Sequence, residues 1–156
     1  VYIAASHEMD ANDTDGEYYD LFVATDIADL TLAAAYQQAR EATDAESADT
    51  WGVSAAYDFG IAGVAADYSV TDEANSNPET TLYNVAATFD VASTTGVAVG
   101  MQNEDVDGAA DDVTAWYANV TYKFPEAKNV SVFAEVADTD EDDVDMGYLA
   151  GLRVKF

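Results

Sequence analysis

Hydrophobic residues recur at every second position along most of this 156-residue chain. In the closing stretch GYLAGLRVKF, for example, Tyr148, Ala150, Leu152, Val154 and Phe156 alternate with a second set of residues. A period of two indicates a β-strand, because successive side chains point to opposite faces. Alternation of this kind predicts ten strands, at residues 1–8, 17–25, 30–39, 50–59, 62–71, 81–89, 96–103, 113–124, 129–137 and 146–156. The alanine-rich segment 30–39 is also compatible with a helix.

The two faces of these strands differ in chemistry. One face holds Val, Ala, Leu, Met and aromatic residues, and the other is small or polar. The chain is acidic, with 31 Asp and Glu against 5 Lys and Arg and a net charge of -26, yet 49% of it is hydrophobic. In a folded chain of this composition, the charged residues and the hydrophobic residues have to lie on different parts of the surface. The charge excludes a nucleic-acid partner by repulsion, and the absence of cysteine excludes disulfides.

Two kinds of connector alternate between the strands. Residues 25–29, 58–63, 90–96 and 125–129 are short connectors with few acids, whereas 8–16, 40–50, 72–80, 104–112 and 138–145 are longer and crowded with Asp and Glu. Within the strands we expect only Glu17, Asp20, Asp67 and Glu135. In an up-and-down meander, alternate connectors lie at opposite ends of the sheet. One end is therefore predicted to be short and nearly uncharged, and the other long and strongly negative.

Aromatic residues gather at both ends of the apolar face, with aliphatic residues between them. Two girdles of aromatic side chains on either side of an aliphatic belt are what the two interfaces of a bilayer select. A soluble β-sandwich instead places its largest aromatic side chains in the middle of the strands. The predicted girdle residues are Tyr19, Trp51, Tyr57, Phe59, Tyr83, Phe89, Trp116, Tyr122, Phe124, Tyr148 and Phe156. The polar face would then line a water-filled interior, with Asp20, Asp67, Asn84, Gln102, Asn119, Thr121, Lys123, Glu135, Arg153 and Lys155 as pore-lining residues.

The ending GLRVKF resembles the C-terminal assembly signal of Gram-negative outer-membrane barrels, carried by Gly151, Val154 and Phe156, although Leu149 stands where that signal has a polar residue. In its alternating strands, short turns and long acidic loops, the whole chain is similar to the C-terminal half of general diffusion porins. Its acidity resembles that of marine gammaproteobacterial members. This resemblance implies a transmembrane antiparallel β-barrel in the outer membrane, in contact with lipid, recognised by the barrel assembly machinery and assembled as a homotrimer. It also implies that the ten strands are part of a 16-stranded barrel; a complete ten-stranded barrel is the alternative.

We therefore expect a porin for small hydrophilic solutes and ions, weakly cation-preferring, without cofactor or catalytic residue. The polar face, with Lys123, Arg153 and Lys155 against Asp20, Asp67 and Glu135, is nearly balanced, so the acidic loops would set selectivity, and the inward charges could equally form structural salt bridges. A narrow structural or receptor barrel and a soluble acidic β-sandwich adhesin are the competing hypotheses. His7 is expected to be an ordinary rim residue. No specific metal site is predicted, only weak divalent binding at Asp138, Asp140, Glu141, Asp142, Asp143 and Asp145.

Overall fold

The computed structural model consists of ten antiparallel strands and describes residues 1–9, 16–40, 46–73 and 77–155. The strands are β1 (Tyr2–Met9), β2 (Glu17–Ile27), β3 (Leu30–Arg40), β4 (Ala48–Asp58), β5 (Ala62–Asp72), β6 (Thr80–Ala92), β7 (Thr95–Val106), β8 (Val113–Lys123), β9 (Val130–Thr139) and β10 (Gly147–Val154). All ten predicted strands are present. The helical alternative for residues 30–39 is wrong, because this segment pairs with β2 and β4 along its length.

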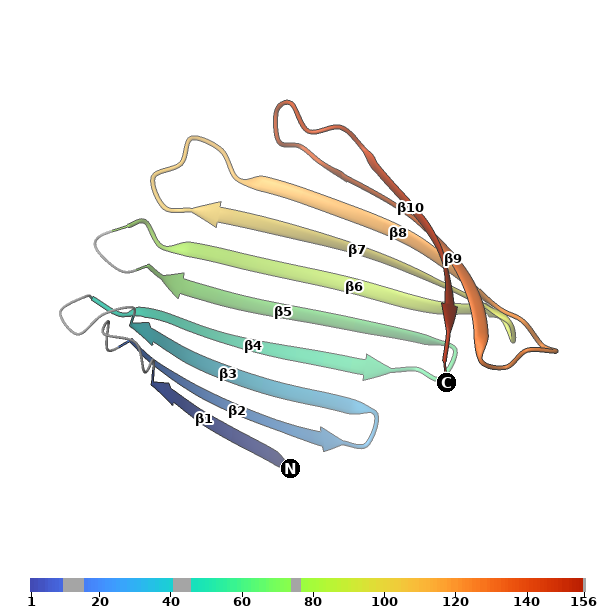
Figure 1. Cartoon of the computed structure of the whole chain (residues 1–156), viewed down its shortest axis with the longest axis horizontal. Coiled ribbons are helices and arrows are strands. Elements are labelled where there is room, and N and C mark those ends of the chain that lie inside the picture. Colours follow the sequence, from blue (N-terminus) through green and yellow to red (C-terminus); the bar gives the residue numbers. More distant parts are fainter. Residues whose placement is uncertain (10–15, 41–45, 74–76, 156) are drawn as a thin grey trace.

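The strands form one sheet in which each pairs with its neighbours in sequence. Figure 1 shows successive strands running in opposite directions, and the two long connectors that are fully described, after β7 and after β9, lie at the same end of the sheet. Three of the four turns at the other end are shorter than predicted; for example, only residues 28–29 separate β2 from β3 and only 93–94 separate β6 from β7. The fourth turn, between β8 and β9, spans residues 124–129. The up-and-down arrangement predicted from the connectors is confirmed.

The apolar face of the sheet has no second layer of protein over it. Among the described residues, Val70 is the only buried hydrophobic side chain, whereas Val53, Val85 and Met101 are each about half exposed. A soluble β-sandwich would bury these side chains between two sheets, so the β-sandwich alternative is wrong. The described part of the chain holds no helix long and apolar enough to cross a membrane.

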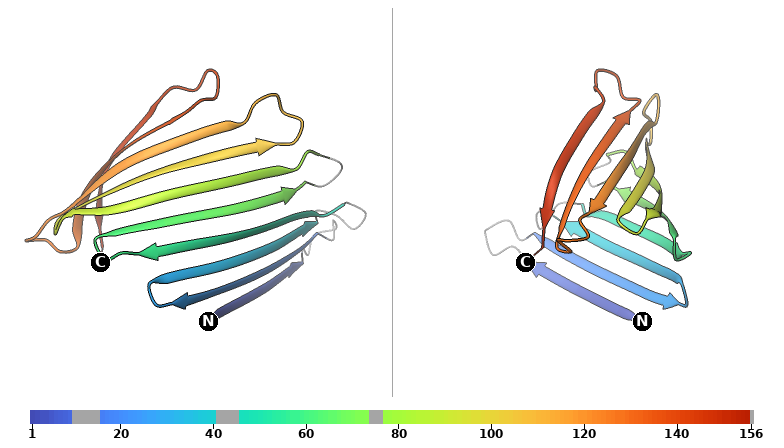
Figure 2. Two further views of the ribbon diagram at one scale, coloured as in Figure 1. Left: turned by 180° about the vertical axis from the view of Figure 1, so that it is seen from behind. Right: turned by 90° about the vertical axis from the view of Figure 1, so that its right-hand side faces the viewer.

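The sheet is twisted and curled rather than flat (Figure 2). A single groove is lined by residues from β3 through β8, among them Thr31, Thr88, Asn119 and Lys123, which all belong to the face with the polar residues. This face, called here the polar face, is therefore the hollowed one. The opposite side, with Val53, Val85 and Val120, is the apolar face. Within the described residues, β1 pairs only with β2 and β10 only with β9, so the sheet has two unpaired edges.

Candidate pore wall and membrane-facing surface

The acids of the polar face are held by neutral partners on adjacent strands. Asp20 on β2 accepts hydrogen bonds from the Ser6 hydroxyl on β1 at 2.6 Å and from the Gln37 amide on β3 at 2.7 Å. Ser6, Asp20 and Gln37 lie directly opposite one another in the sheet register, so one cross-strand row positions all three. Such cross-strand hydrogen bonds fix the carboxylate without neutralising it.

The other two acids predicted to line the pore follow the same pattern. The Asn84 amide donates to Asp67 at 2.7 Å, and the Asn119 amide donates to Glu135 at 3.4 Å. Gln102 lies opposite Asn84 on the next strand. In the described part of the chain the only ion pair joins Arg40 to Glu17, which are on the apolar side of the sheet. The reading of the inward charges as structural salt bridges is therefore wrong, because in the ranges described Asp20, Asp67 and Glu135 form no ion pair with Lys123, Arg153 or Lys155.

More acids lie on the polar face than the sequence analysis placed there. The strands run further into the turns than expected, and Asp26, Asp58 and Asp90 fall within β2, β4 and β6 on the same side as Asp67. Glu8 and Glu104 occupy the corresponding side near the long-loop end. The expectation that the polar face is nearly balanced is therefore wrong. In the sequence these acids alternate in phase with the polar-face residues of their strands, and this alternation could have placed them on the polar face. They stand next to turn residues, however, and the sequence therefore favoured connectors.

Basic residues gather on one part of the polar face, near the short-turn end. Lys123 on β8 and Arg153 on β10 both lie opposite Ser131 of β9, so the three form one cross-strand row. The Arg153 guanidinium lies over the Phe133 ring, 5.7 Å from its centroid, within the range of a cation–π contact. Lys155 follows β10, where its backbone N–H donates to the Asn129 carbonyl.

Several aromatic residues also occupy the polar face, which the sequence analysis described as small or polar. Tyr117 lies opposite Gly100, and Phe133 lies opposite Gly151. A Cβ atom at Gly100 would lie only 2.3 Å from Cε1 of Tyr117, and one at Gly151 only 2.5 Å from Cζ of Phe133. Each ring therefore lies over the bare backbone of its glycine partner, the arrangement known as aromatic rescue. Tyr2 and Phe22 form a further ring pair on this face, with centroids 6.0 Å apart.

The apolar face carries aromatic rings at both ends of its strands. Near the long loops, the Tyr68 ring lies 5.4 Å from both Trp51 and Tyr83, so the predicted girdle also includes Tyr68. Near the short turns, Tyr57 contacts Phe59 at 4.6 Å, and Tyr122 contacts Phe124 at 5.2 Å. Tyr19, Phe89, Trp116 and Tyr148 lie exposed on the same face, and Phe156 is outside the described residues.

The distance between the two predicted aromatic girdles is close to the thickness of the apolar layer of a bilayer. Trp51 and Phe59 are eight residues apart, which is about 26 Å along a strand that rises about 3.3 Å per residue. At a tilt of about 40° this becomes about 20 Å along the membrane normal, before the rings themselves add their own width. The apolar band of outer-membrane barrels is about 25 Å tall, a separation close to this one, and the assignment of these residues to two membrane girdles stays a prediction.

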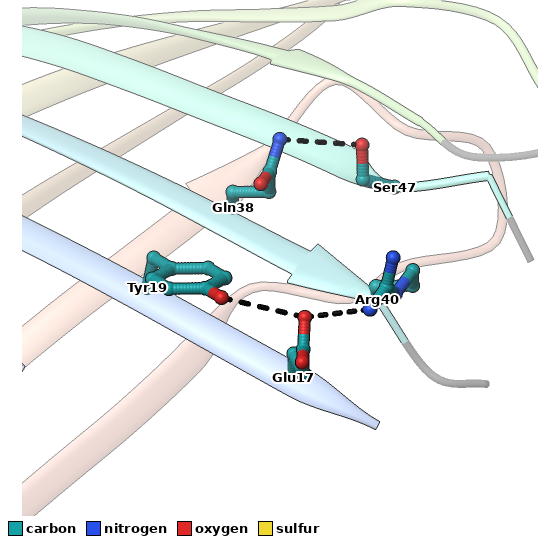
Figure 3. Close-up of polar contacts among 5 residues, drawn as sticks. All are labelled: Glu17, Tyr19, Gln38, Arg40 and Ser47. Carbon is teal, nitrogen blue, oxygen red and sulfur yellow. Dashed lines mark hydrogen bonds and ion pairs between the residues drawn. The ribbon is translucent and has the colours of Figure 1, made fainter. Parts of the chain in front are cut away.

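Beyond the girdle at the long-loop end, the outward side of β2, β3 and β4 becomes polar (Figure 3). Glu17 accepts from Arg40 at 2.5 Å and from the Tyr19 hydroxyl at 3.4 Å, and the Gln38 amide contacts the Ser47 hydroxyl at 3.4 Å. The His7 ring stacks on Tyr19 at 4.3 Å. In the register His7 lies directly opposite Tyr19, at the level of the predicted girdle, and its role as an ordinary rim residue stays a prediction. A change from aromatic to charged side chains is what the border between a membrane interface and water demands.

The acidic loop at residues 138–145 shows no preformed metal site. No group of three or more His, Cys, Asp and Glu side chains converges closely enough to hold a metal ion in the ranges that the structure describes. Asp140 instead accepts from the Thr114 backbone N–H at 2.6 Å and so ties this loop to β8. Weak divalent binding by Asp138, Asp140, Glu141, Asp142, Asp143 and Asp145 stays a prediction.

Comparison with known protein families decides the kind of molecule. A family model described as Gram-negative porin matches residues 1–144. The chain belongs to the Gram-negative porin family. Porins are outer-membrane β-barrels of Gram-negative bacteria and are not enzymes, so this porin is placed in that membrane. The expected family, fold class and location are thereby confirmed. No curated protein matches the chain in sequence.

Solved porin structures share the fold of this chain at low sequence identity. One refined porin structure superposes with a TM-score of 0.83 and 20% identity over 99% of this chain and 57% of its own length. An anion-selective porin from Comamonas acidovorans gives 0.80 and 16% over 97% of this chain and 53% of its own. The outer-membrane protein OmpT of Vibrio cholerae gives 0.73 and 22%, over 88% and 50%. This porin chain therefore spans about half the length of the structures it matches.

Proposed function

We propose that this porin forms a passive, cation-preferring diffusion channel for small hydrophilic solutes. The observation that carries the proposal is the division of one curled sheet into an uncovered apolar face and a hollowed polar face. In a bilayer the first surface suits lipid contact and the second suits water. Diffusion through such a lumen needs neither a cofactor nor a chemical step.

The preference for cations follows from the charges of the polar face. Among the described residues, Asp20, Asp67 and Glu135 accept side-chain hydrogen bonds only from neutral hydroxyl and amide groups. Asp26, Asp58 and Asp90 add further negative charge toward the short-turn end. Carboxylates inside a pore raise the local cation concentration over a Debye length of about 8 Å at physiological salt. The wall thus contributes to selectivity together with the acidic loops.

We further propose that the ten strands are the C-terminal part of a larger, 16-stranded barrel that assembles as a homotrimer. Unpaired strand edges cannot face lipid, because their backbone N–H and C=O groups would have no hydrogen-bond partners. Further strands that pair with the free edges of β1 and β10 would remove both edges. The terminal Gly151, Val154 and Phe156 would be recognised by the barrel assembly machinery.

Planar bilayer recording of the full-length protein tests the channel. We expect stepwise conductance and, under a KCl gradient of about tenfold, a reversal potential of the sign that cation preference gives. Replacing Asp67 with Asn keeps a hydrogen-bond acceptor for Asn84 but removes one charge, and it should move the reversal potential toward zero. The matched control is Asp49→Asn, because Asp49 lies on the outward side and accepts from Tyr36 and Gln38 there. Absence of conductance, or an equal shift with both variants, would contradict the proposal.

A further inference from the structure

We propose that the polar face carries a binding subsite for neutral, polyhydroxylated solutes, in particular oligosaccharides, with Tyr117 as its stacking platform. The inference rests on the proposed channel function and names a class of solute for it. Two features carry it: the way the Tyr117 ring is seated on the sheet, and the kind of polar groups that surround it.

The Tyr117 ring packs over the backbone of a glycine, where the neighbouring strand has no side chain. Gly100 lies directly opposite on β7, and a Cβ atom there would lie 2.3 Å from Cε1, 2.5 Å from Cζ and 2.8 Å from the hydroxyl oxygen of Tyr117. The neighbours in the same cross-strand row are Ala86 on β6 and Ala137 on β9. These small side chains do not cover the ring. Tyr117 is half-buried and lines the hollow of the polar face.

The hollow around Tyr117 is large enough for sugar units. Its volume is about 740 Å³, and its lining includes Asp67, Asn84, Gln102 and Glu135 besides Tyr117. Small-molecule sites typically occupy about 300–1,000 Å³ and combine an apolar or aromatic surface with a few polar groups. A pyranose has the matching surface, because its C–H faces pack on an aromatic ring while its hydroxyls point outward.

The polar groups favour a neutral ligand over an anionic one. Asn84 and Gln102 carry both donors and acceptors, and the Asp67 and Glu135 carboxylates carry acceptors only. Sugar hydroxyls can donate to the carboxylates and exchange both kinds of hydrogen bond with the amides. An anionic solute would instead be repelled by Asp67 and Glu135, neither of which has a basic partner among the contacts of the described residues.

Single-channel recording of the full-length protein in KCl, with maltohexaose as the probe, tests this subsite. We expect transient blockage of the ion current whose frequency saturates with maltohexaose. Tyr117→Ala should shorten the blocked time about threefold to tenfold, as expected for the loss of one aromatic contact. Tyr117→Phe should retain most of it. Gly100→Ala should shorten it as well, because the new Cβ displaces the ring without removing it.

Two controls separate binding from obstruction and from loss of the channel. A polyethylene glycol of matching size should reduce the current without saturable blockage, and Phe22→Ala, which removes a polar-face ring on β2, should leave the maltohexaose blocks unchanged. An open channel that maltohexaose does not block, or blocks equally in Tyr117→Ala, would overturn the subsite and leave the channel proposal standing. A protein without any ion current would instead overturn the channel proposal itself.

Discussion

Arginine substitution at two adjacent residues of β8 tests which face of the sheet meets lipid. Val120 lies four residues from Trp116 and four from Phe124 on the apolar face, midway between the girdles, and is 40% exposed. Four residues correspond to about 13 Å along the strand and about 10 Å along the membrane normal at a tilt of about 40°. Val120→Arg therefore places a charge near the bilayer midplane.

The expected cost follows from that depth. Arginine at the midplane of a lipid-facing strand costs about 2–4 kcal/mol, which lowers the ratio of folded to unfolded protein about 30-fold to 700-fold. The matched control, Thr121→Arg, differs by one position and points to the groove that also holds Asn119 and Lys123. In contact with water, this substitution should change the free energy of unfolding by no more than about 0.5 kcal/mol. It should, however, reduce the cation preference.

Both variants can be compared by urea unfolding from lipid vesicles, followed through the fluorescence of Trp51 and Trp116, the two tryptophans of the chain. The measurement gives the free energy of unfolding of each variant relative to the parent protein. Equal losses at Val120 and Thr121 would refute the assignment of the two faces, and with it the channel. A larger loss at Thr121 would reverse the faces.

Three further outcomes are expected. Gly151→Ala should lower the free energy of unfolding by about 1–3 kcal/mol, because its Cβ would collide with the Phe133 ring. The control Gly147→Ala should be nearly neutral, because its Cβ would lie 3.8 Å from the nearest atom. Similar losses in the two variants would contradict the packing of Phe133 on Gly151. Arg40→Met should cost less than about 1 kcal/mol, because the ion pair with Glu17 is about one-third exposed, and a larger loss in the same urea titration would show that this contact is more than a surface pair. Chelation of divalent cations should leave the unfolding midpoint unchanged, because the divalent binding predicted at the acidic loop is weak and no group of three metal ligands converges in the described ranges. A lower midpoint with EDTA would reveal a site that stabilises the fold.

The sequence by itself determined which face each residue of a strand occupies. Alternation is a local property of the extended backbone, so the side of Val120 relative to Thr121 follows once β8 is recognised as a strand. The two kinds of connector likewise fixed which ends of the strands lie together. Strand ends were less certain. Asp26, Asp58 and Asp90 stand beside turn residues in the sequence, which places them in connectors, although backbone pairing continues through them.

Only the tertiary structure decided which residues of different strands meet. Gly100 and Tyr117 each have an unremarkable place in their own strand, and their contact exists because the register of β7 and β8 sets them opposite each other. The same holds for Gly151 with Phe133 and for Arg40 with Glu17, which are separated by 23 residues. Register depends on turn length and on the pairing of whole strands. The local alternation of residues determines the face of the sheet on which a side chain lies. The residue that it contacts on the next strand is determined by the register of the assembled sheet.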